Sequence, residues 1–203
     1  KSVVFRAKTG EIEIEETAIM VYHMTIAGLE RDLPICKVSD QLSIGAFVIF
    51  GDPELTENSA RDLLARVPDY DYILTAETKG IPLAHEMARQ RGDKKYFVAR
   101  KSPKLYMPKT LEVTVHSITT ANEQKLYLDS EDADIMRGKR VLIVDDVIST
   151  GESLKALETL VTAAGGNICG RAAILAEGDA SSRDDIVFLE KLPLFDKDGE
   201  PID

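Results

Sequence analysis

Two adjacent carboxylates late in the chain are the side chains best placed to do chemistry. Asp145 and Asp146 follow an apolar run over residues 141–144, which is typical of a strand buried inside a parallel sheet. A loop of small residues, Ser149-Thr150-Gly151, comes next and leads into a helical pattern. The amides of such a loop and the positive end of the helix can hold a phosphate dianion, while the carboxylates can accept hydrogen bonds from ribose hydroxyls. The segment VLIVDDVISTGES, residues 141–153, therefore favours a site for a phosphorylated sugar.

Two more polar segments follow predicted strands in the same way. Glu77-Thr78-Lys79-Gly80 comes after the apolar run 72–76, and a tight turn that offers backbone amides and a lysine can bind a diphosphate. Arg100-Lys101-Ser102-Pro103-Lys104 comes after the run 96–99 and carries three cations in five residues. Because the carboxyl ends of parallel strands share one edge of an open sheet, we expect these segments and the acid pair to face a single crevice.

The elements that must position these segments change character along the chain. Residues 1–50 are β-rich, because apolar and polar residues alternate there over short runs. We expect a hairpin around Lys8-Thr9-Gly10 and strands over residues 22–26 and 35–38, with turns at residues 27–28 and 32–34.

Strand–helix alternation begins after residue 55. Thr56 is predicted to cap a helix that Pro68 stops, a second helix ends at Gly92, and a third ends at Gly165-Gly166. The expected apolar helix faces are Ala60, Leu63, Leu64 and Val67, then Leu83, Ala84, Met87 and Ala88, then Leu154, Leu157, Leu160 and Val161. The expected strands cover residues 72–76, 96–99, 141–144, 168–175 and 186–189. This order predicts βαβ units, and therefore an α/β fold with a central, mostly parallel sheet flanked by helices.

The stretch from residue 101 to residue 134 interrupts this alternation. Leu111, Val113 and Val115 alternate with polar residues, as do Leu126 and Leu128 after a polar turn. We expect two antiparallel strands that form a ribbon, project from the sheet and can close over a ligand.

Length and composition indicate one globular domain of 203 residues, with residues 1–55 as a β-rich extension and residues 56–203 as the α/β core. No apolar run approaches ~20 residues, so no membrane span is expected, and the first ten residues lack the apolar core of a secretory signal. Cys36 and Cys169 stand far apart among apolar neighbours, which is typical of reduced packing residues in a cytoplasmic protein. The net charge of −10 argues against a protein built to coat nucleic acid.

VLIVDDVISTGES resembles the 5-phosphoribosyl-1-pyrophosphate (PRPP) motif of type I phosphoribosyltransferases. The similarity extends over most of the chain. Glu77-Thr78-Lys79-Gly80 is similar to the family's pyrophosphate loop, and residues 99–104 resemble a basic segment of its adenine and xanthine branch. The ribbon over residues 113–128 resembles the mobile catalytic loop of that branch, and residues 33–50 resemble the N-terminal hood that covers the purine. The resemblance thus implies the type I fold with a β-rich hood and a ribbon loop.

The resemblance also implies a reaction: a purine base and PRPP give a nucleoside 5′-monophosphate and pyrophosphate, a step of purine salvage. Mg²⁺ would be held by substrate oxygens and water rather than by a protein cage, and a homodimer is implied. Asp145 and Asp146 would orient the ribose hydroxyls and offset positive charge on the sugar, and Glu123 at the ribbon turn is the candidate to reach the base. The implied 5′-phosphate ligands are Ser149, Thr150, Gly151, Glu152 and Ser153; the pyrophosphate ligands are Thr78, Lys79, Gly80, Arg100, Lys101 and Lys104; the base-binding residues are Leu42, Ser43 and Glu177.

Departures from the family's pattern favour adenine over xanthine as the base. Gly178 stands where xanthine-type members have a lysine after the glutamate matched by Glu177, and Ser43 stands where they have a hood asparagine. The Pro-Gly segment usual in adenine enzymes is not evident over residues 42–50, so xanthine or another base stays open as an alternative. A further alternative is a non-catalytic, PRPP-sensing transcriptional regulator. Residues 1–35 are too short for a winged-helix module and include an acidic run, so we expect no nucleic-acid partner.

Overall fold

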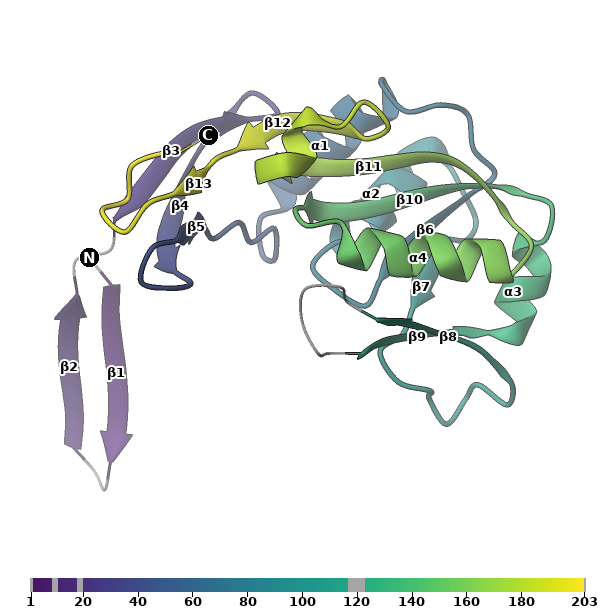
Figure 1. Ribbon diagram of the computed structural model, residues 1–203, viewed down its shortest axis with the longest axis horizontal. Helices are drawn as coiled ribbons and strands as arrows, with labels where there is room; N and C mark the ends of the chain where they lie inside the picture. Colours follow the sequence, from purple (N-terminus) through teal and green to yellow (C-terminus); the bar gives the residue numbers. More distant parts are fainter. Residues whose placement is uncertain (1, 9–10, 18–19, 117–122, 203) are drawn as a thin grey trace. The chain divides into compact units, whose positions relative to one another are not determined.

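The computed structural model describes residues 2–8, 11–17, 20–116 and 123–202 (Figure 1). The chain divides into two compact units. The first consists of residues 1–25, 30–47 and 193–203, and the second of residues 26–29 and 48–192. The C-terminal residues therefore belong to the β-rich unit, and we describe each unit by itself.

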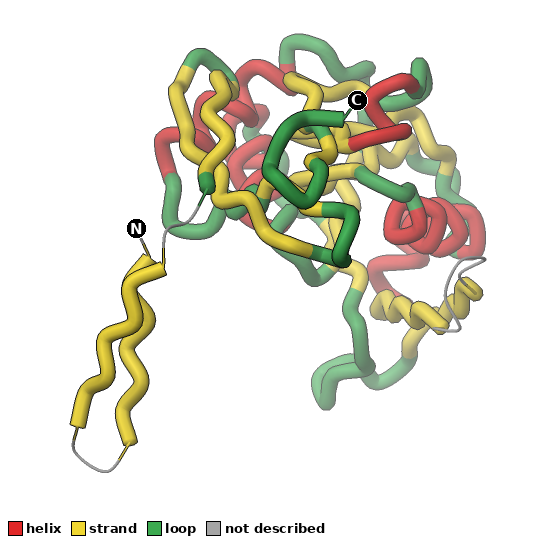
Figure 2. Tube along the Cα trace, turned by 60° about the vertical axis from the view of Figure 1, so that its left-hand side comes forward, coloured by secondary structure: helices red, strands yellow, loops and turns green. Residues whose placement is uncertain are grey.

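The first unit is built from strands, shown in yellow in Figure 2. β1 (Ser2–Lys8) and β2 (Glu11–Thr17) pair in antiparallel register, which confirms the predicted hairpin strands; the turn residues Thr9 and Gly10 lie outside the described residues. A second sheet has the order β13-β5-β4-β3. Its strands are β3 (Val21–Ile26), β4 (Leu29–Lys37), β5 (Ser43–Gly45) and β13 (Leu194–Phe195).

The turn predicted at residues 32–34 is wrong, because β4 runs straight through it. The Pro34 carbonyl accepts a hydrogen bond from Ala46 N–H (2.8 Å), and Ile35 N–H donates to the Met20 carbonyl (2.8 Å). Pro34 lacks only an N–H that this arrangement does not use, so the extended chain tolerates it. Cys36, on the same strand, is exposed rather than packed, while Cys169 is half-buried; both are free thiols.

The second unit has a five-stranded sheet of order β12-β11-β10-β6-β7. Its strands are β6 (Tyr72–Ala76), β7 (Phe97–Ala99), β10 (Arg140–Ile148), β11 (Asn167–Glu177) and β12 (Val187–Leu192). Every neighbouring pair is parallel, which confirms the predicted parallel sheet. Helix α4 (Glu152–Ala163) covers one face, and α1 (Pro53–Leu64) and α2 (Ile81–Arg91) cover the other (Figure 1).

Helix α1 begins one turn earlier than predicted. Its cap is Asp52, whose Oδ1 accepts a hydrogen bond from Leu55 N–H (3.0 Å), and not Thr56. Thr56 lies inside the first turn, where its hydroxyl donates to the Asp52 carbonyl (2.7 Å). Asp followed by Pro at the first helical position is a strong start signal, because the proline lacks an N–H that would otherwise be unpaired. The predicted ends of α2 at Gly92 and of α4 near Gly165 are confirmed.

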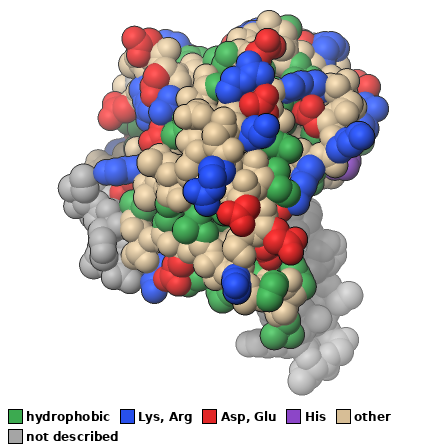
Figure 3. Space-filling model, turned by 90° about the vertical axis from the view of Figure 1, so that its right-hand side faces the viewer, with side chains coloured by type: hydrophobic (Ala, Val, Ile, Leu, Met, Phe, Trp, Pro, Cys, Tyr) green, Lys and Arg blue, Asp and Glu red, His purple; other side chains and the backbone are tan. Residues whose placement is uncertain are grey.

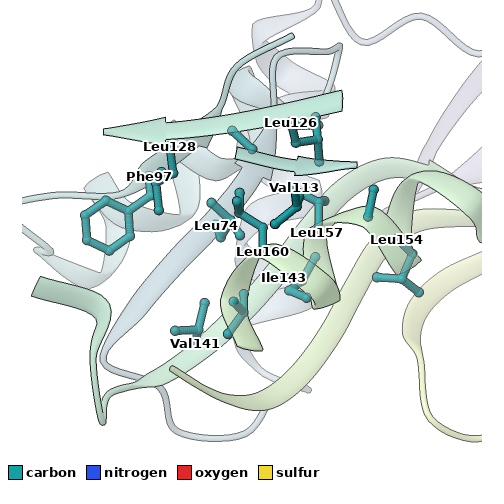
Figure 4. Close-up of a cluster of buried hydrophobic side chains, with 14 of the residues drawn as sticks. Leu74, Phe97, Val113, Leu126, Leu128, Val141, Ile143, Leu154, Leu157 and Leu160 are labelled. Atoms are coloured by element: carbon teal, nitrogen blue, oxygen red, sulfur yellow. The ribbon is translucent and has the colours of Figure 1, made fainter. Parts of the chain in front are cut away.

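The ribbon consists of β8 (Thr110–His116) and β9 (Glu123–Asp129), paired antiparallel as predicted, and is followed by α3 (Ser130–Met136), which was not predicted. One face of the ribbon packs into the core rather than projecting from it. Val113, Leu126 and Leu128 are buried in the cluster that also holds the α4 residues Leu157 and Leu160 (Figure 4). The base of the ribbon is therefore held rigidly against α4.

Charges of both signs are interspersed on the face shown in Figure 3, so the negative net charge is not gathered there into one patch. No helix among the described residues is long and apolar enough to cross a bilayer.

Candidate active site

The site lies where the direction of the sheet's connections changes. From β6 the chain proceeds through α2 to β7 on one side, and from β10 through α4 to β11 on the other. β6 and β10 are hydrogen-bonded neighbours, so a crevice forms beyond their carboxyl ends. The predicted diphosphate turn after β6 and the acid pair of β10 therefore meet.

Two side-chain contacts join this turn to the acid pair. Thr78 Oγ1 donates a hydrogen bond to Asp145 Oδ1 (3.1 Å). Lys79 Nζ lies 3.3 Å from Asp146 Oδ2, close enough for an ion pair but outside hydrogen-bond geometry. One turn thus contacts both acids, and the predicted proximity is confirmed for Thr78 and Lys79.

Gly80 is required by close packing against the acid pair. A Cβ at this position would lie 2.8 Å from Asp145 Oδ1 and 2.8 Å from Thr75 Oγ1, with the Asp145 backbone 3.1 Å away. Since real Cβ atoms do not come so close, any side chain here would push the turn away from β10.

The acids lie within the strand and not after it, which corrects the predicted boundary. The β10–β11 ladder continues past them, with Asp145 opposite Ala173 and Ile148 opposite Ala176. Asp145 is 9 % exposed and Asp146 is 4 % exposed. Burial, and after it the charge of Asp146, raise the pKa of Asp145 to about 7. The site is therefore short of donors that would stabilise a second negative charge.

The loop after β10 forms a small cavity of about 110 Å³, lined by Asp145, Val147, Ile148, Ser149, Thr150, Gly151, Ser153 and Leu154. Gly151 stands at the N-cap of α4 with φ 78°, and no side chain caps the helix there. The N-terminus of α4 therefore faces this loop, and the helix dipole there favours an anion. Four of the predicted phosphate ligands line this cavity; the fifth, Glu152, is the first residue of the helix.

Arg183 is a cation beside this loop that the sequence analysis missed. Its Nη1 lies 3.1 Å from the position that a Cβ on Gly151 would take. Its Nε and Nη2 donate to the two carboxylate oxygens of Asp185 (2.8 and 2.7 Å), which fixes the guanidinium. Arg183 follows the short 3-10 helix η1 (Gly178–Ser182), where no strand or helix pattern marked it as part of a site.

The basic segment after β7 is held next to the diphosphate turn by Glu77. Arg100 Nη1 donates to Glu77 Oε1 (3.0 Å), and Lys104 Nζ lies 3.4 Å from the same oxygen. Lys101 N–H donates to Glu77 Oε2 (3.1 Å). This backbone hydrogen bond is the largest of the influences that lower the pKa of Glu77, and Lys104 and Arg100 add to it. Three of the six predicted pyrophosphate residues, Arg100, Lys101 and Lys104, thus lie around one carboxylate.

The predicted base-binding residues are divided between the units. Leu42 is half-buried and Ser43 is buried in β5, both in the first unit, whereas Glu177 is the buried last residue of β11 in the second. Glu123 is the first residue of β9, and its side chain lies outside the described part of the chain.

The acid pair offers donors that suit a hard cation. Within the described part of the chain, no three His, Cys, Asp or Glu side chains are grouped to hold a metal, and Asp146 Oδ2 is buried without a hydrogen-bond donor. Carboxylate oxygens are ligands that Mg²⁺ prefers, and Mg²⁺ usually retains water and ligand oxygens at its other positions. An ion bound in this way fits the donor set.

The model of the phosphoribosyl transferase domain family matches residues 53–197. A hypoxanthine/guanine phosphoribosyltransferase of Methanococcus voltae is 35% identical over 138 residues, which cover 66% of this chain and 70% of that protein. An adenine phosphoribosyltransferase of Bifidobacterium animalis subsp. lactis is 34% identical over 113 residues, covering 53% of this chain and 55% of that protein. Among solved structures, an adenine phosphoribosyltransferase from Thermoanaerobacter pseudethanolicus shares the fold with a TM-score of 0.60 at 23% identity, covering 70% of this chain and 84% of that one.

Proposed function

Because the chain belongs to the phosphoribosyl transferase domain family, we propose that it transfers the 5-phosphoribosyl group of PRPP to a purine base and releases pyrophosphate. One observation carries the proposal: the turn after β6, the acid pair of β10 and the open N-terminus of α4 lie at one edge of the sheet. They supply, side by side, groups for a diphosphate, for ribose hydroxyls and for a phosphate.

The 5′-phosphate is assigned to the loop over residues 149–153. The cavity there has a volume of about 110 Å³, is lined by the hydroxyls of Ser149, Thr150 and Ser153, and lies at the N-terminus of α4. Arg183 beside Gly151 adds a fixed positive charge on a neighbouring loop.

The acid pair and the cations act on opposite charges of the reaction. When the bond between the anomeric carbon and the pyrophosphate oxygen breaks, positive charge develops on the ribose and negative charge on the leaving group. Asp145 and Asp146 orient the ribose hydroxyls and stabilise the positive charge. Lys79, with the segment Arg100–Lys104, stabilises the departing diphosphate. A Mg²⁺ ion, when bound by substrate oxygens near Asp146, supplies further stabilisation of the diphosphate charge.

Two kinds of purine are candidates for the acceptor base. Ser43 and Gly178 stand where xanthine-type members of the family have a hood asparagine and a lysine, which favours adenine over xanthine. Hypoxanthine or guanine is the second candidate, because those are the bases in the name of the Methanococcus voltae relative. That relative is similar over 138 residues, whereas the adenine phosphoribosyltransferase of Bifidobacterium animalis subsp. lactis is similar over 113.

The test is an assay of the purified protein with PRPP, Mg²⁺ and adenine, hypoxanthine, guanine, xanthine or orotate separately. We expect pyrophosphate release with a purine and none with orotate. Binding of PRPP without turnover of any base would instead support the PRPP-sensing alternative. Asp146→Asn should abolish turnover while its urea unfolding curve stays close to that of the wild type, and undiminished turnover would remove Asp146 from the mechanism.

We also propose that the protein acts as a homodimer, as the family resemblance implies. Sedimentation velocity of the purified chain, with and without PRPP, measures this directly, and a single monomeric species in both conditions would contradict it.

A further inference from the structure

Glu77 contacts the basic segment at three points with one carboxylate. Oε1 faces the guanidinium of Arg100 and the ammonium of Lys104, at opposite ends of the segment, and Oε2 accepts the backbone N–H of Lys101. We propose that Glu77 is a positioning residue that folds Arg100–Lys104 into a pyrophosphate-binding clamp. This inference rests on the proposed function.

The carboxylate itself is held in place by the sheet. Glu77 N–H donates to the Ala99 carbonyl (2.8 Å), so the residue stands between the ends of the neighbouring strands β6 and β7. Thr78 and Lys79 follow it directly and contact the acid pair. Any movement of Glu77 would therefore move the basic segment and the diphosphate turn together.

Arg100 extends the connection to the ribbon. Its backbone N–H and carbonyl both pair with Tyr127 of β9 at 2.8 Å, and its Nη2 donates to the Tyr106 hydroxyl. Arg100, whose guanidinium Glu77 holds, is thus attached through its backbone to a strand whose other face packs against α4. The Lys101 ammonium, in contrast, has no partner among the described residues, and its backbone is fixed by Glu77, so that its charge remains available to a ligand.

Two physical effects predict opposite outcomes when the carboxylate is removed. If only net charge mattered, loss of a negative charge next to three cations would strengthen the binding of a diphosphate. If Glu77 positions the segment, its loss leaves the Lys101 amide without its acceptor and the cations free to repel one another, and diphosphate binding weakens. The sign of the change therefore separates a positioning role from a purely electrostatic one.

The experiment compares the wild type with Glu77→Ala and Glu77→Gln, using calorimetric titration with inorganic pyrophosphate and then steady-state kinetics. Loss of a hydrogen bond to a charged group predicts that Glu77→Ala weakens pyrophosphate binding and raises KM for PRPP by ~10-fold or more, with KM for the base nearly unchanged. Glu77→Gln keeps an oxygen acceptor for Lys101 N–H but turns an amide NH2, which is a donor, towards Arg100 and Lys104, so its pyrophosphate affinity should lie between that of Glu77→Ala and that of the wild type. Thermal unfolding of each variant establishes that it is folded.

Glu86→Ala is the matched control. Glu86 on α2 accepts two hydrogen bonds from Arg89 (2.7 Å each), so the variant also removes an arginine–glutamate pair, but one that does not contact the clamp. We expect its pyrophosphate affinity to equal that of the wild type. Pyrophosphate binding by Glu77→Ala that is as tight as, or tighter than, wild-type binding would overturn the inference. Because pyrophosphate binding is measured without a base, the result stands even if no base is converted and the proposed function fails.

Discussion

Replacing Asp145 by asparagine should make the protein more stable and inactive. The side chain accepts hydrogen bonds from Thr78 Oγ1 and from Asp146 N–H at Oδ1, and an asparagine oxygen can accept both. The amide has no charge to be desolvated, whereas the carboxylate does. Turnover should be lost because the site no longer has a second carboxylate for the ribose.

The size of the effect follows from the pKa of Asp145, which burial and Asp146 raise from 3.8 to about 7. Between these two pH values the folded protein keeps the proton that the unfolded chain has released. Stability therefore falls as pH rises from about 4 to 7 and then levels off, and the difference corresponds to ~4 kcal/mol. Since asparagine does not titrate, the variant should exceed the wild type by ~4 kcal/mol at pH 8 and by less than ~1 kcal/mol at pH 4.

Urea unfolding at pH 4, 6 and 8, without ligands, measures this directly. Asp71→Asn is the control of opposite sign, because hydrogen bonds from Arg140 lower the pKa of Asp71 to about 2. Asp71 stabilises the fold above pH 3.8 and ceases to do so as pH falls towards 2. Asp71→Asn should thus be less stable than the wild type by a similar amount at pH 4, 6 and 8, with a deficit that disappears only as pH falls from about 4 towards 2. An Asp145→Asn variant no more stable than the wild type at pH 8, or a difference independent of pH, would refute the reasoning.

Three further substitutions, two of them with a matched control, test the packing of the site and of the ribbon. Gly80→Ala places a Cβ within 2.8 Å of a carboxylate oxygen of the acid pair, so it should cost ~1–3 kcal/mol in urea unfolding and abolish PRPP binding in calorimetry; unchanged binding would contradict the close approach. Gly151→Ala, at φ 78°, should destabilise by ~1 kcal/mol or more and weaken ribose 5-phosphate binding. Gly165→Ala, at φ 77° beyond the other end of α4, should destabilise similarly without affecting that binding. Leu126→Ala should lower the free energy of unfolding by ~2–5 kcal/mol, because this side of the ribbon is part of the core. Lys125→Ala, on the exposed side, should lower it by less than ~1 kcal/mol. Equally small decreases for both variants would mean that the ribbon is not packed against the core.

Elements with a strong local pattern could be predicted from the sequence. The strand over residues 72–76 has the predicted bounds, and the apolar faces of α2 and α4 are buried as expected. The two helices combine a clear apolar period with glycine next to their ends, so local propensity and burial agree.

Predictions that depended on a single residue were less secure. Thr56 has a side chain that can cap a helix. The cap is nevertheless Asp52, directly before Pro53, because its carboxylate accepts the hydrogen bond from Leu55 N–H. Pro34 suggested a turn, yet the hydrogen bonds that residues 34 and 35 form with Met20 and Ala46 hold the chain extended there. The sequence predicts the acids of β10 at the end of the strand, because aspartate is rare in strands. In the structure the ladder to β11 continues through them.

The residues that the sequence could not assign are those that act through a partner distant in the chain. Nothing near Arg183 indicates a site; its significance comes from its position against Gly151. Glu77 belongs to a recognised segment, but its role is visible only when Arg100 and Lys104 are seen to converge on it.

Burial of the acid pair costs the protein stability at neutral pH. A fold gains nothing from Asp145 at neutral pH, since burial holds its pKa near 7 and its ionisation destabilises the protein. Thr78 and Lys79 offset only part of this, because the turn supplies one hydroxyl donor and one ammonium to two carboxylates. A ligand that brings hydroxyl donors and a cation would restore the missing interactions. The cost in stability and the proposed affinity for a ribose with a metal ion would therefore have one origin, which is a strand that continues to Ile148 and carries its acids into the interior.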